Sequence, residues 1–277
     1  MRNYLTKILD WQTDEVANQY DELPLWSSPF GILLMDNFPL GDYEQYLDIG
    51  CGTGFPLIDI SQRLGNKCKA YGIDPWRAAI NRARTKIKTI GLTNIELLED
   101  DASILPFQNE SFDLVTSNLG INNFEDPLAI LKECYRVMKA GASFCATTNL
   151  NGTFQEFYDV FEKTLTDIGL ASKYASKYSS HVNHRGTISS MRELFEKSNF
   201  KIVKQIESSY QMRFLNGSAF LNYSVVIVGF IHPWRTMFDE GDKQIFFETF
   251  EKNLNEYSER KGELKLTIPM AYFECRK

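Results

Sequence analysis

The chain has 277 residues, 43% of them hydrophobic and 24% charged, so it can bury a sizeable core and is not disordered. Its formal net charge of −6 disfavours a nucleic-acid partner, because proteins that follow a phosphate backbone usually carry a basic face. Five scattered cysteines without a C-x-x-C pair predict neither disulfides nor a zinc site. The sequence has no signal-peptide core and no apolar run near the ~20 residues of a membrane span, which favours a cytoplasmic protein without membrane contact.

From residue 45, short apolar runs alternate with amphipathic helical patterns, which is typical of βαβ units around a parallel sheet. A helix should begin at Asp74-Pro75 and end at Gly91, since Asp and Pro favour helix starts and Gly favours helix ends. The same signals place a second helix between Asp126-Pro127 and Gly141. The predicted strands are Gln45–Ile49, Cys68–Ile73, Ile95–Glu99, Phe112–Asn118 and Ser143–Asn149.

After Asn149 the pattern loosens around a polar stretch, Ala171–Gly186, which we interpret as a solvated loop. A strand over Leu264–Cys275 ends the chain, with Pro269 at a bulge or an exposed position because proline cannot donate a hydrogen bond to a sheet. The other predicted elements are helices over Phe154–Ile168 and Ile188–Ser198, a strand over Lys201–Glu207, and then a helical block that includes Ser218–Ile231 and Asp242–Tyr257.

The most informative feature is the glycine-rich turn at residues 50–54 (GCGTG), directly after the first strand. Glycines let a backbone pass close to a ligand, and Asp74, at the end of the second strand, can accept hydrogen bonds from two ribose hydroxyls. A dinucleotide fingerprint needs its third glycine where Phe55 stands, which disfavours a nicotinamide dehydrogenase. A ligand that carries a carboxylate and an amine fits the turn better, with Asp48 near the amine.

Five short motifs stand in a consistent order between residues 45 and 150. They are Leu47-Asp48-Ile49-Gly50-Cys51-Gly52-Thr53-Gly54, Gly72-Ile73-Asp74, Asp101-Ala102 with Leu105-Pro106-Phe107, Ser111-Phe112-Asp113-Leu114-Val115, and Glu133-x-x-Arg136-Val137-Met138-Lys139-x-Gly141. In these motifs the chain resembles the class I S-adenosylmethionine-dependent methyltransferases, in particular the group called type 11.

The resemblance implies an α/β fold. We expect a Rossmann-like seven-stranded sheet, mostly parallel with an antiparallel C-terminal strand, flanked by helices and carrying helical cap and lid additions. Residues 1–40 would form an N-terminal helical lid and residues 41–150 the cofactor-binding core. Residues 151–262 would hold cap insertions with the remaining core helix and strand, and residues 263–277 the final core strand.

The resemblance also implies S-adenosylmethionine as cofactor and S-adenosylhomocysteine as product. It assigns Asp74 to the ribose and Asp101 to the adenine amino group, although Asp74 could be only a helix N-cap and Asp101 an ordinary turn acid. Cys51 could suggest a nucleophile, or it is a small residue whose amide contacts the ligand. The predicted cofactor-binding residues are Tyr20, Asp48, Gly50, Cys51, Gly52, Asp74, Pro75, Asp101, Ala102, Asn118 and Leu119.

Acceptor-side candidates lie outside these motifs. Tyr20 matches a lid tyrosine that closes over the methionyl end in many small-molecule methyltransferases, within the segment 20–26 (YDELPLW). His181 and His184, beside Arg185, could act as a base, hold an anion, bind a metal or only be solvated. The catalytic candidates are therefore Tyr20, His181 and His184, the substrate-binding candidates are Trp26, Phe30, Asn122 and His184, and no metal site is assigned. Trp26 and Phe30 could instead only pack the segment onto the domain.

We therefore expect in-line transfer of a methyl group from S-adenosylmethionine to a small organic acceptor in an enclosed pocket. The alternatives are a protein or RNA acceptor and a non-catalytic cofactor-binding protein on the same fold. A continuous basic strip would favour a polymer. The sequence shows only a cluster of basic residues on one helix, which we interpret as a solvated helix face: Arg82, Arg84, Lys86 and Lys88.

Overall fold

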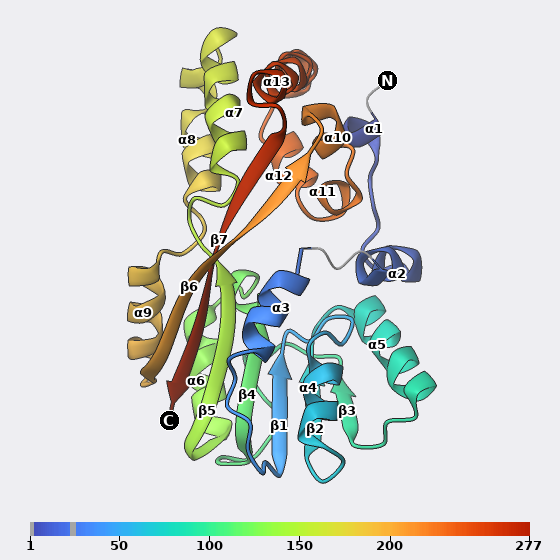
Figure 1. The fold of residues 1–277 in the computed structure, drawn as a ribbon, viewed down its shortest axis with the longest axis vertical. Helices are drawn as coiled ribbons and strands as arrows, with labels where there is room; N and C mark the ends of the chain where they lie inside the picture. The colour runs from blue at the N-terminus through green and yellow to red at the C-terminus, as the bar shows by residue number, and fades with distance from the viewer. Residues whose placement is uncertain (1–2, 23–25) are drawn as a thin grey trace. The chain divides into compact units, whose positions relative to one another are not determined.

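The computed structural model describes residues 3–22 and 26–277. The chain divides into two compact units (Figure 1). Unit 1 consists of Met1–Leu9, Leu150–Gly186 and Ser209–Pro269, and unit 2 of Asp10–Asn149, Thr187–Ser208 and Met270–Lys277.

A seven-stranded sheet with the order β3-β2-β1-β4-β5-β7-β6 forms the centre of unit 2, and its last two strands run on into residues of unit 1. The first five strands pair in parallel, and β7 runs antiparallel to β5. This confirms the predicted fold class. The strands are β1 (Gln45–Ile49), β2 (Lys69–Ile73), β3 (Ile95–Leu98), β4 (Phe112–Asn118), β5 (Met138–Asn149), β6 (Lys201–Phe214) and β7 (Leu264–Arg276).

The helices of unit 2 follow the predicted periodicity. Gly91 has φ 79° and ends α5, as expected, and the Asp126 carboxylate caps α6 by accepting the Ala129 N–H at 3.0 Å. These elements are α2 (Asp14–Glu22), α3 (Ser28–Met35), α4 (Leu57–Leu64), α5 (Arg77–Ile90), the 3-10 helix η1 (Gly120–Asn122), α6 (Pro127–Val137) and α9 (Ile188–Lys197).

In unit 2, two predicted helix boundaries were wrong by two residues or more. Helix α5 begins at Arg77 rather than at Asp74-Pro75, because the Asp74 carboxylate accepts the N–H groups of Gly52 and Trp76 instead of capping a helix. Helix α6 ends at Val137, before the expected Gly141. The following residues pair with β4 from Met138 onward, so the end of the apparent helical stripe already belongs to β5.

Unit 1 is helical and its core is aromatic. The rings of Phe157, Phe161 and Phe250 meet at centroid distances of 4.9–5.9 Å and are fully buried. Such ring contacts add to the free energy of burial. The helices are α1 (Asn3–Thr6), α7 (Gln155–Asp167), α8 (Ala171–Val182), α10 (Gly217–Leu221), α11 (Ser224–Gly229), α12 (Ile231–Thr236) and α13 (Glu240–Lys261). The predicted helical segment Ser218–Ile231 is divided among α10, α11 and α12. In the described part of the chain, no helix combines the length and hydropathy that crossing a bilayer requires.

The polar stretch 171–186 is mostly a helix, α8, and the prediction of a loop was wrong. Tyr174, Tyr178 and His181 recur at helical spacing: Tyr174 is buried, and Tyr178 stacks on Phe161 at 5.5 Å. The polar residues between them make this narrow stripe hard to recognise in the sequence.

Within β7, Pro269 is half-buried and its carbonyl accepts the Leu150 N–H at 3.0 Å.

Candidate cofactor site

The glycine-rich turn lies at the carboxyl end of β1, an inner strand next to the point where the sheet order reverses, between β1 and β4. Such switch points are where open α/β sheets bind ligands. Gly50 and Gly52 have φ of 72° and 51°, and the Gly50 N–H donates to the Ile73 carbonyl at 2.9 Å. A Cβ on Gly50 would lie 3.1 Å from the Cα of Gly120, whereas one on Gly52 would meet nothing within 4 Å. The turn is therefore tight on one side and open on the other.

Asp74 connects this turn to the end of β2. One carboxylate oxygen accepts the Gly52 N–H at 2.9 Å, and the other accepts the Trp76 N–H at 2.8 Å. Burial raises the pKa of Asp74 in spite of these two bonds. The residue at the N-cap of α5 is Trp76, so the alternative that Asp74 serves only as that helix's N-cap is wrong. Its contact with ribose stays a prediction.

Asp48 is a buried carboxylate with one oxygen unsatisfied. The side chain is 1% exposed, and its Oδ1 accepts the Thr116 hydroxyl at 2.5 Å. Tyr46 donates to Thr116 in turn at 2.7 Å, while Asp48 Oδ2 has no hydrogen-bond partner among the described residues. Burial, opposed by the Thr116 bond and reinforced by the charge of Asp74, raises the pKa of Asp48 to about 7. An orphaned, buried carboxylate oxygen beside the turn fits a ligand ammonium group.

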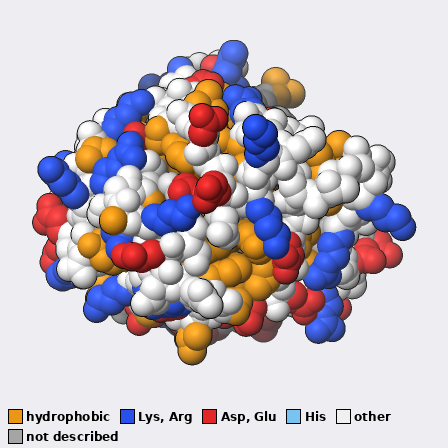
Figure 2. Space-filling model, turned by 90° about the horizontal axis from the view of Figure 1, so that it is seen from below, with side chains coloured by type: hydrophobic (Ala, Val, Ile, Leu, Met, Phe, Trp, Pro, Cys, Tyr) orange, Lys and Arg blue, Asp and Glu red, His pale blue; other side chains and the backbone are white. Residues whose placement is uncertain are grey.

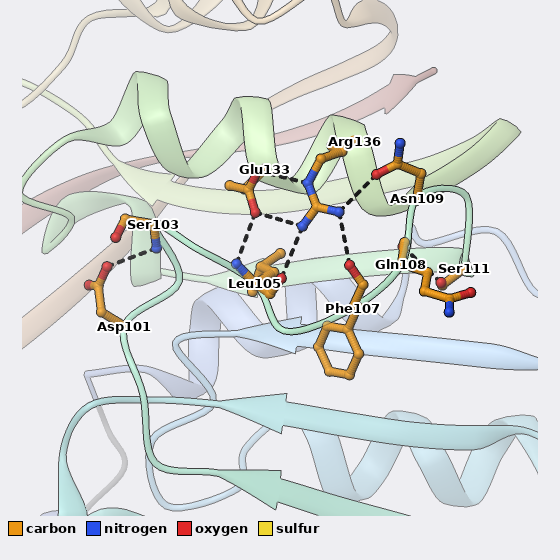
Figure 3. Close-up of polar contacts among 9 residues, drawn as sticks. All are labelled: Asp101, Ser103, Leu105, Phe107, Gln108, Asn109, Ser111, Glu133 and Arg136. Carbon is orange, nitrogen blue, oxygen red and sulfur yellow. Dashed lines mark hydrogen bonds and ion pairs between the residues drawn. The ribbon is translucent and has the colours of Figure 1, made fainter.

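The loop between β3 and β4 carries the predicted adenine contacts (Figure 3). Asp101 is exposed and its carboxylate accepts the Ser103 N–H at 2.8 Å, while Ala102 is buried. This bond is what an ordinary turn acid makes, and a contact of Asp101 with adenine stays a prediction.

The residue after β4 has a strained backbone conformation. Leu119 is buried and has φ 64°, a left-handed conformation that is uncommon outside glycine and concentrates at functional sites. The carboxamide oxygen of Asn118 accepts the Thr147 hydroxyl at 2.7 Å. Both residues therefore lie at the carboxyl end of the sheet, as predicted, together with Cys51, which is buried and has its pKa raised by burial. A buried neutral thiol is a poor nucleophile.

Helix α2 packs on α5 and brings Tyr20 toward Asp74. The Tyr20 ring lies 5.5 Å from Trp76 and 6.2 Å from Trp11, and the pKa of Tyr20 is raised by burial and by the Asp74 charge. The position of Tyr20 at the site is consistent with a lid, and its catalytic role stays a prediction. Leu23, Pro24 and Leu25 of the predicted lid lie outside the described residues.

Asp21 holds α2 in place. Its carboxylate pairs with Arg82 at 2.7 Å and Lys86 at 2.5 Å. Burial raises the pKa of Asp21, but the hydrogen bonds from the two cations outweigh it and hold that pKa below its usual value. The interpretation of these basic residues as a solvated face was therefore wrong for Arg82 and Lys86. The pairing joins residues more than 60 positions apart, which no local pattern reveals.

The acceptor-side candidates of unit 2 lie in packed surroundings. Phe30 is fully buried, 5.7 Å from the Trp26 ring, and the Asn122 carboxamide donates to Asn149 Oδ1 at 2.6 Å. The residue after Phe30 is Gly31, and any Cβ there would overlap the Phe55 ring. The side chain that replaces the third glycine of a dinucleotide fingerprint thus packs directly on α3. Acceptor contacts of these residues stay predictions.

His181 and His184 belong to unit 1. His181 Nε2 lies 2.8 Å from the Tyr158 hydroxyl and 3.0 Å from the indole nitrogen of Trp234. Burial, with the nearby His184 and Arg185, lowers the pKa of His181 to about 4, so at neutral pH it is an uncharged hydrogen-bond acceptor. His184 is exposed and shares a shallow hollow with Lys177. No group of three or more potential metal ligands occurs among the residues described.

Sequence reasoning missed three residues at the site. Thr116 satisfies Asp48, Trp76 covers Tyr20, and Gly120 makes room for the turn: its own Cβ would lie 2.5 Å from the Ser117 hydroxyl. Thr116 is opposite Asp48 in the β1–β4 register, so a polar residue within a buried strand was the available signal.

Comparison with known proteins agrees with this geometry. Residues 47–146 match the family described as Methyltransferase domain. The chain is 36% identical over 116 residues to a demethylmenaquinone methyltransferase of Lactococcus lactis, which covers 42% of this chain and 46% of the relative. It is 31% identical over 171 residues to that of Listeria welshimeri, which covers 59% of this chain and 72% of the relative. Its matches to the first three relatives span only 46–60% of their own length.

A solved structure shares the fold. The phosphoethanolamine N-methyltransferase 2 of Haemonchus contortus, solved with phosphomonomethylethanolamine and S-adenosylhomocysteine, superposes with a TM-score of 0.58. The two are 16% identical, and the match covers 100% of this chain and 60% of the other. At that identity the likeness shows the fold alone.

Proposed function

The chain belongs to the class I S-adenosylmethionine-dependent methyltransferases, and from this premise we propose that it transfers the methyl group of S-adenosylmethionine to a small organic acceptor. The observation that carries the proposal is the pair of carboxylates beside the glycine-rich turn. Asp48 has an unsatisfied, buried oxygen, and Asp74 holds the Gly52 amide. Two acids at this switch point fit a ligand with an ammonium group and a ribose.

The protein's residues have a binding and orienting task. Asp48 would accept from the methionyl ammonium, and Asp74 would accept from the ribose hydroxyls and repel a 2′-phosphate. The open side of Gly52 would admit the methionyl chain. When bound, the sulfonium supplies a methyl group that is already activated for displacement. The remaining work is to align the acceptor with that methyl group and to exclude water.

A small acceptor is favoured by the acidic net charge of the chain and by the mixed charge of the face shown in Figure 2. On the face shown in Figure 2, basic and acidic side chains are interspersed, and no continuous basic strip crosses the described residues there. Polymer substrates with a phosphate backbone favour a single-sign basic surface. The relatives are named for demethylmenaquinone, but the family match at residues 47–146 lies within unit 2. An aromatic acceptor of that class is therefore one candidate among small acceptors.

The proposal is tested with isotope-labelled S-adenosylmethionine and a cell extract divided into metabolite, RNA and protein fractions. Wild-type protein should place label in the metabolite fraction, whereas Asp74→Ala should place far less when S-adenosylmethionine is supplied below saturation. Asp59→Ala is the matched control, because Asp59 is an exposed acid on α4 of the same unit and pairs only loosely with Arg63 at 3.8 Å. Label in RNA or protein would overturn the small acceptor. Binding of S-adenosylhomocysteine with no labelled product would favour a non-catalytic protein.

A further inference from the structure

The motif Glu133-x-x-Arg136 takes no part in the cofactor contacts described above, yet it is among the best-connected groups of unit 2. The two residues lie one turn apart on α6, and both side chains point at the loop between β3 and β4 (Figure 3). They form a salt bridge at 2.7 Å. An ion pair of this kind on a helix surface contributes little by itself. The loop contacts are what set this pair apart.

Arg136 uses every guanidinium donor. Two bonds go to the Glu133 carboxylate, at 2.8 Å and 2.7 Å. The other three reach the loop: the Phe107 carbonyl at 2.8 Å, the Asn109 side chain at 2.9 Å and the Leu105 carbonyl at 3.0 Å. The rigid fork of arginine can satisfy five acceptors at once, which a lysine ammonium cannot do.

Glu133 binds the same loop through the carboxylate that pairs with Arg136. Its Oε2 accepts the Leu105 N–H at 2.9 Å, so both backbone groups of Leu105 are bound by the pair. The hydrogen bond from Arg136 lowers the pKa of Glu133, which keeps the carboxylate charged. Leu105 is also buried, whereas Ile104 just before it is 79% exposed. The backbone of Leu105 is therefore held in place, and this restricts the positions of the residues just before it in the loop.

Those preceding residues include Asp101 and Ala102. We infer that Glu133 and Arg136 are positioning residues for the adenine end of the cofactor site, acting through Leu105. This inference rests on the proposed function, because it takes the loop to contact adenine. The pair fixes the loop from α6, so that Asp101 and the Ala102 amide stand in place before the ligand arrives. Preorganisation of this kind strengthens binding without any direct contact.

The test compares Arg136→Lys and Glu133→Gln with the matched control Lys132→Ala, an exposed residue of the same helix. S-adenosylhomocysteine binding is measured by calorimetry, and folding by urea denaturation. Arg136→Lys keeps the charge but loses the fork, so the Kd should rise about tenfold, in the middle of the range for residues coupled through one network. Glu133→Gln should raise it less, and the control should leave it unchanged.

A double-mutant cycle with Asp101→Asn separates positioning from plain stability. If the pair acts by placing Asp101, Arg136→Lys should add little to the loss already caused by Asp101→Asn. For an analogue without the adenine amino group, the difference in Kd between wild type and Arg136→Lys should be smaller than for S-adenosylhomocysteine, because only the Ala102 amide contact would then depend on the loop. Additive losses, or lower stability with unchanged Kd, would overturn the inference. If the wild-type protein does not bind S-adenosylhomocysteine, the proposed function fails. If the wild-type protein binds it and both variants bind it equally well, only the inference about Glu133 and Arg136 fails.

Discussion

Replacing Asp48 by Asn should stabilise the ligand-free protein at high pH while weakening cofactor binding. The pKa of Asp48 stands at about 7 instead of the usual 3.8, chiefly because the carboxyl is buried. At pH values below 3.8, the Asp48 carboxyl is mostly protonated in both the folded and the unfolded chain. As the pH rises toward 7, the unfolded chain ionises first, so the free energy of unfolding falls.

The size of the effect follows from the pKa change. One pKa unit corresponds to about 1.4 kcal/mol, so the rise from 3.8 to about 7 removes roughly 4 kcal/mol by pH 8. Asparagine does not ionise, and its oxygen can still accept from Thr116. Its NH2 group would take the position of Oδ2, which has no hydrogen-bond partner among the described residues. At low pH the protonated carboxyl of the wild-type residue is likewise uncharged at that position. Asp48→Asn should therefore resemble wild type near pH 4 and be more stable than wild type by up to about 4 kcal/mol at pH 8.

The measurement is urea unfolding of wild type and Asp48→Asn at several pH values between 4 and 8, without ligand. Calorimetry with S-adenosylhomocysteine at pH 8 should show a weaker complex for the variant, since the charged acceptor for its ammonium group is gone. A stability difference that does not change with pH would refute the reasoning, because Asp48 would then titrate as in the unfolded chain. Equal affinities of wild type and Asp48→Asn for S-adenosylhomocysteine would show that Asp48 does not bind the ammonium group.

Three further outcomes are expected. Asp74→Ala should lower S-adenosylhomocysteine affinity roughly ten- to a few hundredfold by calorimetry, from about 1.5–3 kcal/mol per hydrogen bond to a charged group; an unchanged Kd would exclude a ribose contact. Gly120→Ala should cost about 1–3 kcal/mol in urea unfolding, because its Cβ would stand 2.8 Å from the Ile49 carbonyl, and full stability would mean that β4 shifts freely. Asp21→Asn should cost about 1 kcal/mol and speed amide exchange in α2, by loss of its pairs with two cations of α5, whereas unchanged exchange would show that the aromatic contacts alone hold α2.

The sheet was predictable where the chain is locally informative. Strands β1 and β4 were predicted at their observed bounds because both are central and nearly all their residues are buried, which produces short apolar runs. Asp126 was identified as a helix cap because capping needs only residues a few positions apart. The glycine-rich turn and Asp74 were correctly located at the ends of β1 and β2, because each directly follows a short apolar run in the sequence.

Partners that are distant in sequence were not predictable. Thr116 meets Asp48 only through the register of two strands, which is a property of the folded sheet. Strand β6 runs to Phe214, seven residues beyond its predicted end at Glu207, because an edge strand carries polar residues on an open side and so resembles a loop. Helix α8 was missed because the stripe that packs on the rest of unit 1 is made of Tyr and His, of which only Tyr174 is fully buried, rather than of aliphatic residues.

The contact between Gly31 and Phe55 has a consequence for the history of the family. Gly31 lies outside the matched segment 47–146 and Phe55 lies inside it, yet the ring fills the space that a side chain at position 31 would need. Neither position can change size alone without a clash or a void. Across descendants of a common ancestor, the two positions should therefore covary: a bulkier residue at 31 should accompany a smaller one at 55, and glycine at 31 should be inherited together with an aromatic ring at 55.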